Sequence, residues 1–174
     1  MGRLNELPIY LDETGALTVA DIRHRCRRLR ATTGSLGAIF IDYLQLLRPP
    51  TLARNANRNE EISEICRTLK VTAKELAIPI VALAQLNRGV ETRTEKRPML
   101  ADLRDSGSLE QEADIVAFLY RDGYYHPESS PEPDKTEFII AKHRNGQTGT
   151  VPLRFQKEYT VFLPYGDESQ YPQP

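Results

Sequence analysis

The sequence predicts an α/β fold: a mostly parallel sheet flanked by helices, with an antiparallel hairpin near the end of the chain. Two segments with helical spacing of apolar residues are each followed by a continuous apolar run, at residues 38–41 and 79–84. A helix followed by a buried strand, twice in succession, indicates right-handed crossovers and therefore parallel strands. Two further strand-like runs flank Asn145-Gly146, a dipeptide that is typical of a hairpin turn.

The first third of the chain is predicted to form a strand, a helix and a second strand. Residues 7–11 are a short apolar segment and predict the first strand. Thr18 and Asp21 have the pattern of a helix start, with an acid in the first turn. We expect the helix to turn an apolar stripe toward the sheet and its arginines toward solvent. The stripe recurs at spacings of three and four: Val19, Ile22, Cys26 and Leu29.

A second helix is predicted from Glu60 onward. Before it, Arg48-Pro49-Pro50 ends regular structure and residues 51–59 form a polar loop. The apolar positions of the helix are Ile62, Ile65, Leu69, Ala73 and Leu76. After the strand over residues 79–84, residues 86–100 show no periodicity and carry several charges, so we expect a long exposed loop there.

The last part of the chain is predicted to contain a short helix and the remaining strands. Ser108 and Gln111 fit a capping box, and an apolar run over residues 115–120 predicts a third strand. A surface loop follows over residues 123–134. The hairpin strands cover residues 136–142 and 150–155, and a last strand covers residues 159–163. We expect one domain over residues 1–163 and a disordered tail over residues 164–174.

The composition limits the class of protein. With 174 residues, 40% of them hydrophobic, the chain is long enough to bury one core. The net charge of -1 excludes a generic polyanion binder, so any contact with nucleic acid must be local. Cys26 and Cys66 lack the spacing of a zinc site, and the three histidines are scattered. With no apolar run of membrane-spanning length and no signal peptide pattern, we expect no membrane association and a cytoplasmic location.

Asp42 is the first candidate site residue, because a run of uncharged residues leads directly to its carboxylate. In open α/β sheets ligands collect at the carboxyl ends of the strands, so Asp42 would lie where a phosphate-bound Mg²⁺ can sit. This small hard cation prefers oxygen ligands and keeps several waters. The run therefore fits a Walker B strand. The alternative that stays open is a core strand ending in a turn or capping aspartate.

Gln85, Lys142 and Arg144 are further candidates at strand ends. The Gln85 amide could donate to a γ-phosphate oxygen and accept from an attacking water. Lys142 and Arg144 are two residues apart, so they should project from one face, and a guanidinium there suits an arginine finger. The residues alone are equally consistent with a hydrogen bond to a loop for Gln85, and with an ordinary charged sheet edge for Lys142 and Arg144.

Four longer segments contain these motifs: residues 37–47, 84–88, 96–114 and 142–149. The third includes the run Asp102-Leu-Arg-Asp-Ser-Gly-Ser-Leu-Glu-Gln-Glu-Ala-Asp114. Together, and in this order, the segments resemble the RecA-like motor domain of bacterial hexameric replicative helicases of the DnaB type. The resemblance extends from about Leu7 to Phe162.

The resemblance implies an ATP-dependent DNA helicase that unwinds duplex DNA by moving on single-stranded DNA as a hexameric ring, with ATP and Mg²⁺ as cofactors. It implies that Asp42 is the Walker B acid and metal ligand, and that Gln85 senses the γ-phosphate. Lys142 and Arg144 would form the basic finger that reaches the ATP of the adjacent subunit. The implied partners are single-stranded DNA, neighbouring subunits of a homohexamer and, through the full-length protein, primase and a helicase loader.

By the same resemblance, Arg104, Asp105 and Gly107 belong to a loop that grips the phosphates of single-stranded DNA. A glycine lets backbone N–H groups approach a phosphate, one arginine supplies charge, and few base-reading side chains are present. These properties suit sequence-independent binding. Taken alone, Arg104 and Asp105 would be better explained as a local surface ion pair.

The sequence contains no GxxxxGK[ST] segment, the loop that holds the β- and γ-phosphates in such motors. In the family this loop lies before the region that residues 7–11 resemble. We therefore expect the chain to start inside the motor domain, truncated on the N-terminal side of its core. The remaining sheet should expose apolar surface, and the isolated chain should hydrolyse ATP negligibly.

Two other functions stay open from the sequence. The chain could be an isolated non-catalytic fragment that acts only as a ring-interface or single-stranded-DNA binding module. In that case ATP turnover would be absent while weak, salt-sensitive DNA binding survives. It could also come from another RecA relative, such as a recombinase or a phage primase-helicase, although residues 102–114 are much more similar to the replicative helicases.

Overall fold

The computed structural model describes residues 6–49 and 58–166, without the side chains of residues 104–108. The chain forms two compact units, which meet in the sequence between Gln85 and Leu86. The single domain over residues 1–163 that the sequence predicts stays a prediction. Two further expectations from the sequence fall largely outside the described ranges: the polar loop over residues 51–59, and the tail, of which only residues 164–166 are described.

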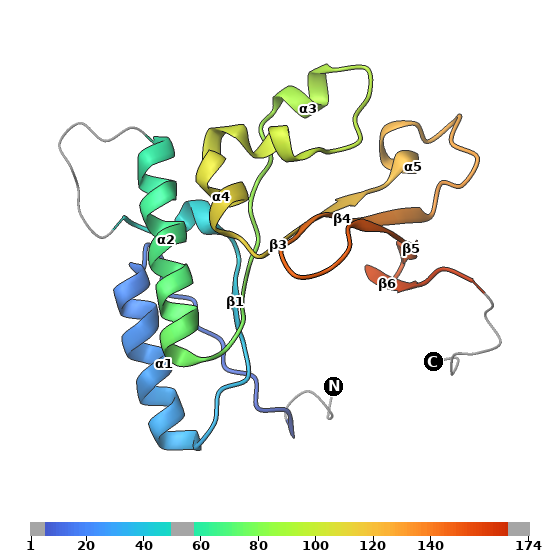
Figure 1. Cartoon of the computed structure of the whole chain (residues 1–174). Coiled ribbons are helices and arrows are strands. Elements are labelled where there is room, and N and C mark those ends of the chain that lie inside the picture. Colours follow the sequence, from blue (N-terminus) through green and yellow to red (C-terminus); the bar gives the residue numbers. More distant parts are fainter. Residues whose placement is uncertain (1–5, 50–57, 167–174) are drawn as a thin grey trace. The chain divides into compact units, whose positions relative to one another are not determined.

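The first unit combines long helices with a parallel pair of strands. Its elements are α1 (Val19–Thr33), β1 (Ile39–Ile41), the 3-10 helix η2 (Leu44–Leu46), α2 (Arg58–Leu76) and β2 (Ile80–Ala82). Helices α1 and α2 lie side by side (Figure 1). Strand β1 pairs with β2 in parallel, with Ile41 opposite Ala82. The predicted order of helix, strand, helix and strand is confirmed.

Helix α1 begins where the sequence predicts it. The Thr18 hydroxyl accepts from the Asp21 N–H at 3.2 Å, and the Asp21 carboxylate accepts from the Thr18 N–H at 2.9 Å. This reciprocal pair is a complete capping box, which satisfies two backbone donors at the helix start. The helix ends at Gly34, whose φ of 81° lies in the left-handed region that glycine adopts without a steric penalty.

Some arginines on the basic side of α1 contact α2. Arg23 and Arg27 form ion pairs with Glu75, and Arg30 donates to the Leu76 carbonyl at 3.1 Å. The expectation that the arginines face only solvent is therefore partly wrong. The arginines turn from solvent because α1 packs on α2. At the edges where the two amphipathic helices meet, their charges are opposite.

Only one face of the β1–β2 pair is covered by described residues. Ile39 and Ile41 are buried, whereas Phe40 is 77% exposed. Val81 is the register partner of Phe40, lies on the same face and is also exposed. The strand is therefore buried on one face only within the described ranges, and its other face exposes apolar side chains, as expected for a truncated sheet. Successive side chains alternate between the faces of a strand, and the second face meets no described element.

The strand predicted over residues 7–11 is not formed. The Ile9 N–H bonds locally to the Leu7 carbonyl at 2.8 Å, and Leu7, Ile9 and Leu11 are exposed. An apolar segment becomes a strand only where a neighbouring strand supplies hydrogen-bond partners. No strand of the described sheets pairs with this segment, so it runs as irregular backbone.

The second unit is built on an antiparallel sheet in the order β3-β4-β5-β6. Its strands are β3 (Ile115–Tyr120), β4 (Lys135–His143), β5 (Gly149–Gln156) and β6 (Val161–Pro164). The predicted third strand and the hairpin are confirmed. The antiparallel part extends beyond the β4–β5 hairpin, because β3 also pairs with β4 in antiparallel orientation and β6 pairs with β5 in the same way. The α/β class is confirmed, with parallel pairing confined to β1 and β2 among the described strands.

The core of the second unit lies on one face of β3. Side chains of β3 alternate between buried and exposed positions, as period-two spacing requires. The buried members pack with residues from β4 and from the segment before β3. The cluster consists of Leu103, Val116, Phe118, Tyr120 and Ile139.

Short helices complete this unit. The helices α3 (Gly89–Thr92), η3 (a 3-10 helix, Leu100–Ser106) and α4 (Gly107–Glu112) precede β3, and α5 (Asp122–Tyr125) lies between β3 and β4. The exposed loop expected over residues 86–100 is partly wrong, because it contains α3 and buries Val90 and Pro98. Ser108 lies inside the first turn of α4 and not before it, so the expected cap position is shifted. Its side chain is outside the described residues.

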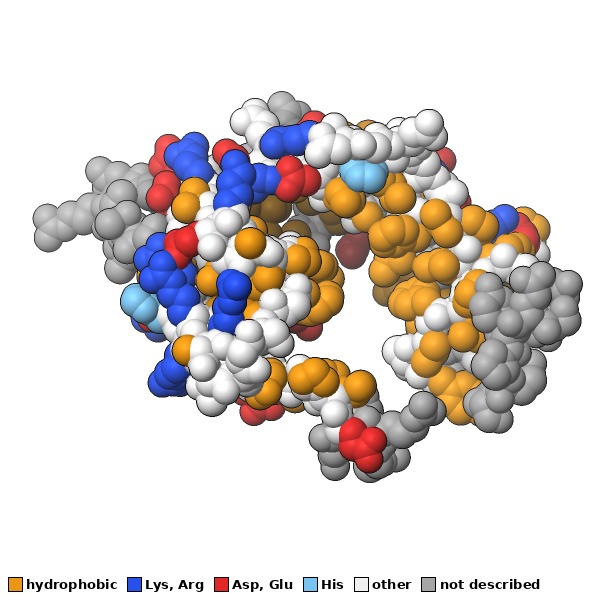
Figure 2. Space-filling model, turned by 60° about the horizontal axis from the view of Figure 1, so that its bottom comes forward, with side chains coloured by type: hydrophobic (Ala, Val, Ile, Leu, Met, Phe, Trp, Pro, Cys, Tyr) orange, Lys and Arg blue, Asp and Glu red, His pale blue; other side chains and the backbone are white. Residues whose placement is uncertain are grey.

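The surfaces of both units carry hydrophobic side chains, which appear as orange areas in Figure 2. On the sheet of the second unit these include Leu119, Phe138 and Phe162. No helix in the part of the chain that the structure describes is long and apolar enough to cross a membrane.

Candidate nucleotide site and nucleic-acid interface

Asp42 and Gln85 lie at the same edge of the parallel pair. Ile41, the last residue of β1, is the partner of Ala82, the last residue of β2. Beyond the strands the two chains stay joined, because the Leu83 N–H donates to the Ile41 carbonyl at 2.9 Å. The Leu44 N–H then donates to the Leu83 carbonyl, also at 2.9 Å. The acid and the amide therefore follow neighbouring strands at the carboxyl edge, where such sheets collect ligands.

Gln45 holds the backbone of Gln85. Its side-chain Nε2 donates to the Gln85 carbonyl at 3.4 Å, and its Oε1 accepts from the Gln85 N–H at 3.5 Å. The Gln45 carbonyl in turn accepts from Arg58 of α2 at 2.6 Å. Sequence reasoning missed Gln45. The available signal was a single amide within the otherwise apolar run Leu44-Gln45-Leu46-Leu47.

The carboxylate of Asp42 is exposed, and it forms no ion pair with another residue in the described ranges. Among the described residues no group of three or more His, Cys, Asp and Glu side chains could hold a metal ion. A lone carboxylate fits Mg²⁺ in sites where phosphate oxygens and waters supply the other ligands. Asp42 is therefore suited to a metal that arrives with a nucleotide.

Lys142 and Arg144 bind the C-terminal end of α4. Lys142 Nζ donates to the carbonyls of Glu110 and Gln111, and the Arg144 guanidinium donates to the Gln111 carbonyl at 3.1 Å. The last carbonyls of a helix lack intrahelical partners and carry partial negative charge, so they attract cations. The two basic residues share one face, as their spacing predicts. In this structure that face is turned to their own unit.

Arg104, Asp105 and Gly107 fall at the junction of η3 and α4. Their side chains lie outside what the structure describes, so their contacts stay a prediction. The residues just before them are fixed: Leu103 is buried in the core cluster and Asp102 is 9% exposed. The proposed DNA-contact segment therefore starts from a rigid point and continues into a helix whose far end holds Lys142 and Arg144.

An aromatic cavity of about 320 Å³ opens on the second unit, and sequence reasoning missed it. The guanidinium of Arg121 lies 4.4 Å from the ring centre of Phe155. Thr136 is 2% exposed, and its Oγ1 has no hydrogen-bond partner among the described residues. Rings and a guanidinium plane of this kind stack on nucleobases. The lining residues are Leu119, Tyr120, Arg121, Tyr124, Tyr125, Thr136, Phe155 and Phe162.

These features define an α/β protein in which Asp42 and Gln85 follow neighbouring parallel strands, at the edge where such sheets bind ligands. Comparison with known proteins gives the family. The family model of the DnaB-like helicase C terminal domain matches residues 1–164. The chain belongs to this family, and the resemblance found in its sequence motifs is confirmed.

The similar proteins are replicative helicases. Replicative DNA helicase DnaB of Geobacillus stearothermophilus is 52% identical over 175 residues, which cover 99% of this chain and 38% of that protein. Replicative DNA helicase DnaC of Bacillus subtilis (strain 168) is 53% identical, over 94% of this chain and 35% of that protein. The chain thus spans little more than a third of the length of these relatives.

Solved structures give the same result for the fold. An ATPase domain of known structure matches with a TM-score of 0.88 and 45% identity, covering 94% of this chain and 57% of that chain. A DnaB-like replicative helicase, described together with its interactions with primase, matches with a TM-score of 0.88 and 46% identity. That match covers 94% of this chain and 38% of the other.

Proposed function

We propose that this chain is the C-terminal part of the ATP-dependent motor of a replicative DNA helicase, which unwinds duplex DNA by moving along single-stranded DNA as a hexameric ring. The observation that carries the proposal is the position of Asp42 and Gln85 at one carboxyl edge of the β1–β2 pair. A carboxylate that suits Mg²⁺ and an amide that suits the γ-phosphate follow two neighbouring, hydrogen-bonded strands at this edge. Membership of the DnaB-like family supports the same function.

The chemistry at this edge follows from the residue types. Asp42 would ligate Mg²⁺ through a carboxylate oxygen, and the bound ion would neutralise charge on the phosphates of ATP. Gln85 would hydrogen-bond a γ-phosphate oxygen and orient the attacking water. Gln45 would keep Gln85 in place by holding its backbone N–H and carbonyl. The γ-phosphate of ATP bound at this edge would then be sensed by the Gln85 side chain, whose backbone is held in place.

Lys142 and Arg144 would act on the nucleotide of an adjacent subunit. A guanidinium presents a fixed fork of donors to phosphate oxygens and stabilises the charge of the transferred phosphoryl group. In a ring, such a residue makes hydrolysis depend on the neighbour. Release of these side chains from the α4 carbonyls would accompany that contact.

The remaining surfaces suit DNA and the nucleotide base. Arg104, Asp105 and Gly107 would contact the phosphates of single-stranded DNA without reading sequence. The cavity beside Arg121 and Phe155 would accept a nucleobase by stacking. Primase and a helicase loader would act through the full-length protein, in the cytoplasm.

The test uses Geobacillus stearothermophilus DnaB in which this chain replaces the matched segment, called the exchange helicase below. We expect it to hydrolyse ATP, to be stimulated by single-stranded DNA and to unwind a forked duplex. Asp42→Asn should lower the rate of hydrolysis roughly 100-fold, because one charged contact to the bound metal is lost. The control is Asp134→Asn, an exposed aspartate of a surface loop. Equal rates for Asp42→Asn and the unsubstituted exchange helicase would contradict the proposal.

A second function is favoured by one observation, the lack of a GxxxxGK[ST] segment in this sequence. The isolated chain would then act only as a ring-interface or DNA-binding module. We expect the 174-residue chain alone to hydrolyse ATP negligibly and to bind single-stranded DNA weakly, with an affinity that falls as salt rises. ATP turnover by the isolated chain would contradict this second function.

A further inference from the structure

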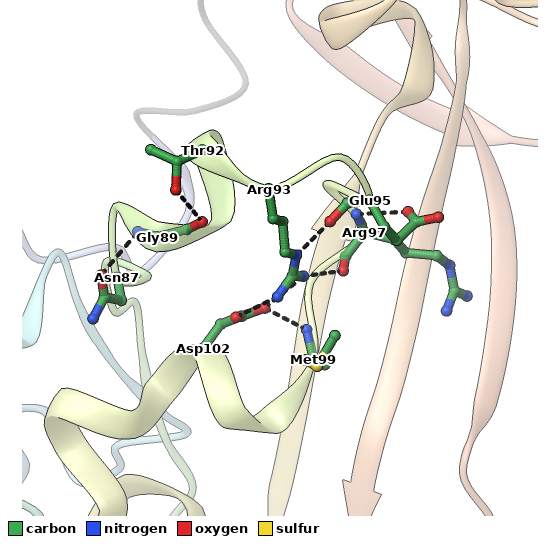
Figure 3. A network of polar contacts seen from close by, with 8 residues as sticks. All are labelled: Asn87, Gly89, Thr92, Arg93, Glu95, Arg97, Met99 and Asp102. Carbon is green, nitrogen blue, oxygen red and sulfur yellow. Dashed lines mark hydrogen bonds and ion pairs between the residues drawn. The ribbon is translucent and has the colours of Figure 1, made fainter.

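In the segment between Gln85 and Arg104, an ion pair joins Arg93 to Asp102. Arg93 Nη1 lies 2.7 Å from Asp102 Oδ1, and Arg93 Nη2 lies 2.9 Å from Asp102 Oδ2, so the contact is bidentate (Figure 3). The Asn87 N–H donates to the Asp102 carbonyl at 3.1 Å and joins the two ends of the segment. The loop over residues 87–102 is therefore a closed unit.

The pair also satisfies backbone groups inside this loop. The Arg93 guanidinium donates to the carbonyls of Glu95 and Arg97, and Asp102 Oδ2 accepts from the Met99 N–H at 2.8 Å. The Asp102 side chain is only 10% exposed and that of Arg93 is 26% exposed. Loss of either partner would leave a largely buried charge without its counter-charge, which is much more costly than loss of a surface pair.

The closed loop is fixed to the sheet at a second point. The Arg97 guanidinium bonds to Glu137 of β4 at 2.7 and 2.8 Å and to the Thr150 hydroxyl of β5 at 3.1 Å. At its end, Asp102 is followed by Leu103, which is buried in the core cluster. The backbone that enters the segment over residues 104–107 is therefore held by an ion pair and by the core.

We propose that Arg93 and Asp102 are positioning residues for the segment over residues 104–107, and that their ion pair sets its geometry for the phosphates of single-stranded DNA. This inference rests on the proposed function. A bidentate fork fixes orientation as well as distance, which a single contact does not. Positioning a phosphate-binding backbone to within a fraction of an ångström requires support of this kind from neighbouring side chains.

Asp102→Asn gives opposite results for a positioning role and for a purely electrostatic one. The substitution removes a negative charge near the proposed path of the DNA, so a purely electrostatic role predicts tighter binding. The positioning role predicts weaker binding, by at least tenfold, because the bidentate contact is lost. Arg93→Gln should weaken binding similarly. For Arg93→Gln, the slope of the logarithm of DNA affinity against the logarithm of salt concentration should stay the same. Loss of a direct phosphate contact would reduce this slope by about one.

The experiment measures the affinity of the exchange helicase for a fluorescently labelled oligothymidylate by anisotropy, over a range of salt concentrations. Hexamer size and DNA-independent ATP hydrolysis are measured for every variant, and we expect both to be unchanged. The matched control is Glu132→Gln, which breaks an exposed ion pair with Lys135 outside the loop and should leave DNA affinity unchanged. Arg93→Lys keeps the charge but not the fork, and should bind DNA more weakly than the unsubstituted protein.

Unchanged or tighter DNA binding by Asp102→Asn would overturn the inference, as would a reduced salt slope in Arg93→Gln. Loss of assembly in Asp102→Asn, Arg93→Gln and Arg93→Lys alike would also overturn it, since the pair would then serve general stability. Failure of the unsubstituted exchange helicase to bind the oligonucleotide would refute the proposed DNA function itself. Failure of the positioning role would therefore be seen only in the variants, whereas failure of the proposed DNA function would be seen in the unsubstituted exchange helicase.

Discussion

Arg144 is joined to Asp114 by two contacts. Its backbone N–H donates to the Asp114 carbonyl at 2.8 Å, and its guanidinium lies 3.5 Å from the Asp114 carboxylate. The residue just after β4 is thereby fixed to the residue just before β3. Because this guanidinium is engaged within its own unit, the proposed contact with a nucleotide on another subunit would need an exchange of partners.

We predict that Arg144→Ala in the exchange helicase keeps nucleotide binding and loses ATP hydrolysis. The expected loss is roughly 1000-fold, since an arginine finger acts on charge that develops in the transition state. Turnover is measured with and without DNA, and binding with a fluorescent ATP analogue. The control is Lys157→Ala, an exposed lysine in the turn after β5. If Arg144→Ala turned over ATP at the unsubstituted rate, the finger assignment would be wrong.

Gln45→Leu should impair hydrolysis without abolishing the fold. Leucine has a similar volume but cannot bracket the Gln85 backbone, so Gln85 would lose its fixed position. We expect about a tenfold lower kcat with little change in nucleotide affinity, since a misplaced catalytic amide affects the transition state most. The control is Gln147→Leu in the exposed hairpin turn. Equal kcat values for the two variants would show that Gln45 has no part in positioning Gln85.

Gly123→Ala should destabilise the second unit. A Cβ at this position would lie 2.3 Å from the Pro133 carbonyl oxygen and 2.4 Å from its Cα, so backbone must move. Overpacking of this kind costs about 1–3 kcal/mol of unfolding free energy. At Gly37 a Cβ would meet nothing within 4 Å, so Gly37→Ala is the matched control. Urea unfolding compares the two, and equal midpoints would show that the α5 loop yields without cost.

Tyr120 should contribute a late step to the alkaline titration. Burial, followed by its hydrogen bond to Asp122, raises the pKa of Tyr120 from 10.0 to about 12. The unfolded chain loses this proton near pH 10 and the folded chain keeps it longer, so the stabilisation is fully present below pH 10. It is then lost as the pH rises to about 12.

The step is measured by the ultraviolet absorbance of tyrosinate in the folded protein. Tyr120→Phe should remove it, while Tyr124→Phe, at a 69% exposed position, should leave it in place. An unchanged late step in Tyr120→Phe would mean that another tyrosine is responsible.

Local signals predicted most of the elements correctly. The Thr18 and Asp21 capping box acts within one helical turn, and the Asn145-Gly146 turn joins adjacent strands, so both can be recognised without knowledge of the fold. The strand ends that carry Asp42 and Gln85 were also predictable, because each apolar run stops at a polar residue. The segment over residues 7–11 was mispredicted, because apolar composition does not specify a partner strand.

The sequence by itself determined helices α1 and α2, the strands of both sheets and the chemical types at the strand ends, because periodicity, caps and turns depend on residues within a few positions of one another. Only the tertiary structure decided that Gln45 brackets Gln85, that Arg93 pairs with Asp102, and that Phe40 faces outward. These depend on which segments meet and on which faces stay uncovered, and residue spacing along the chain does not specify either.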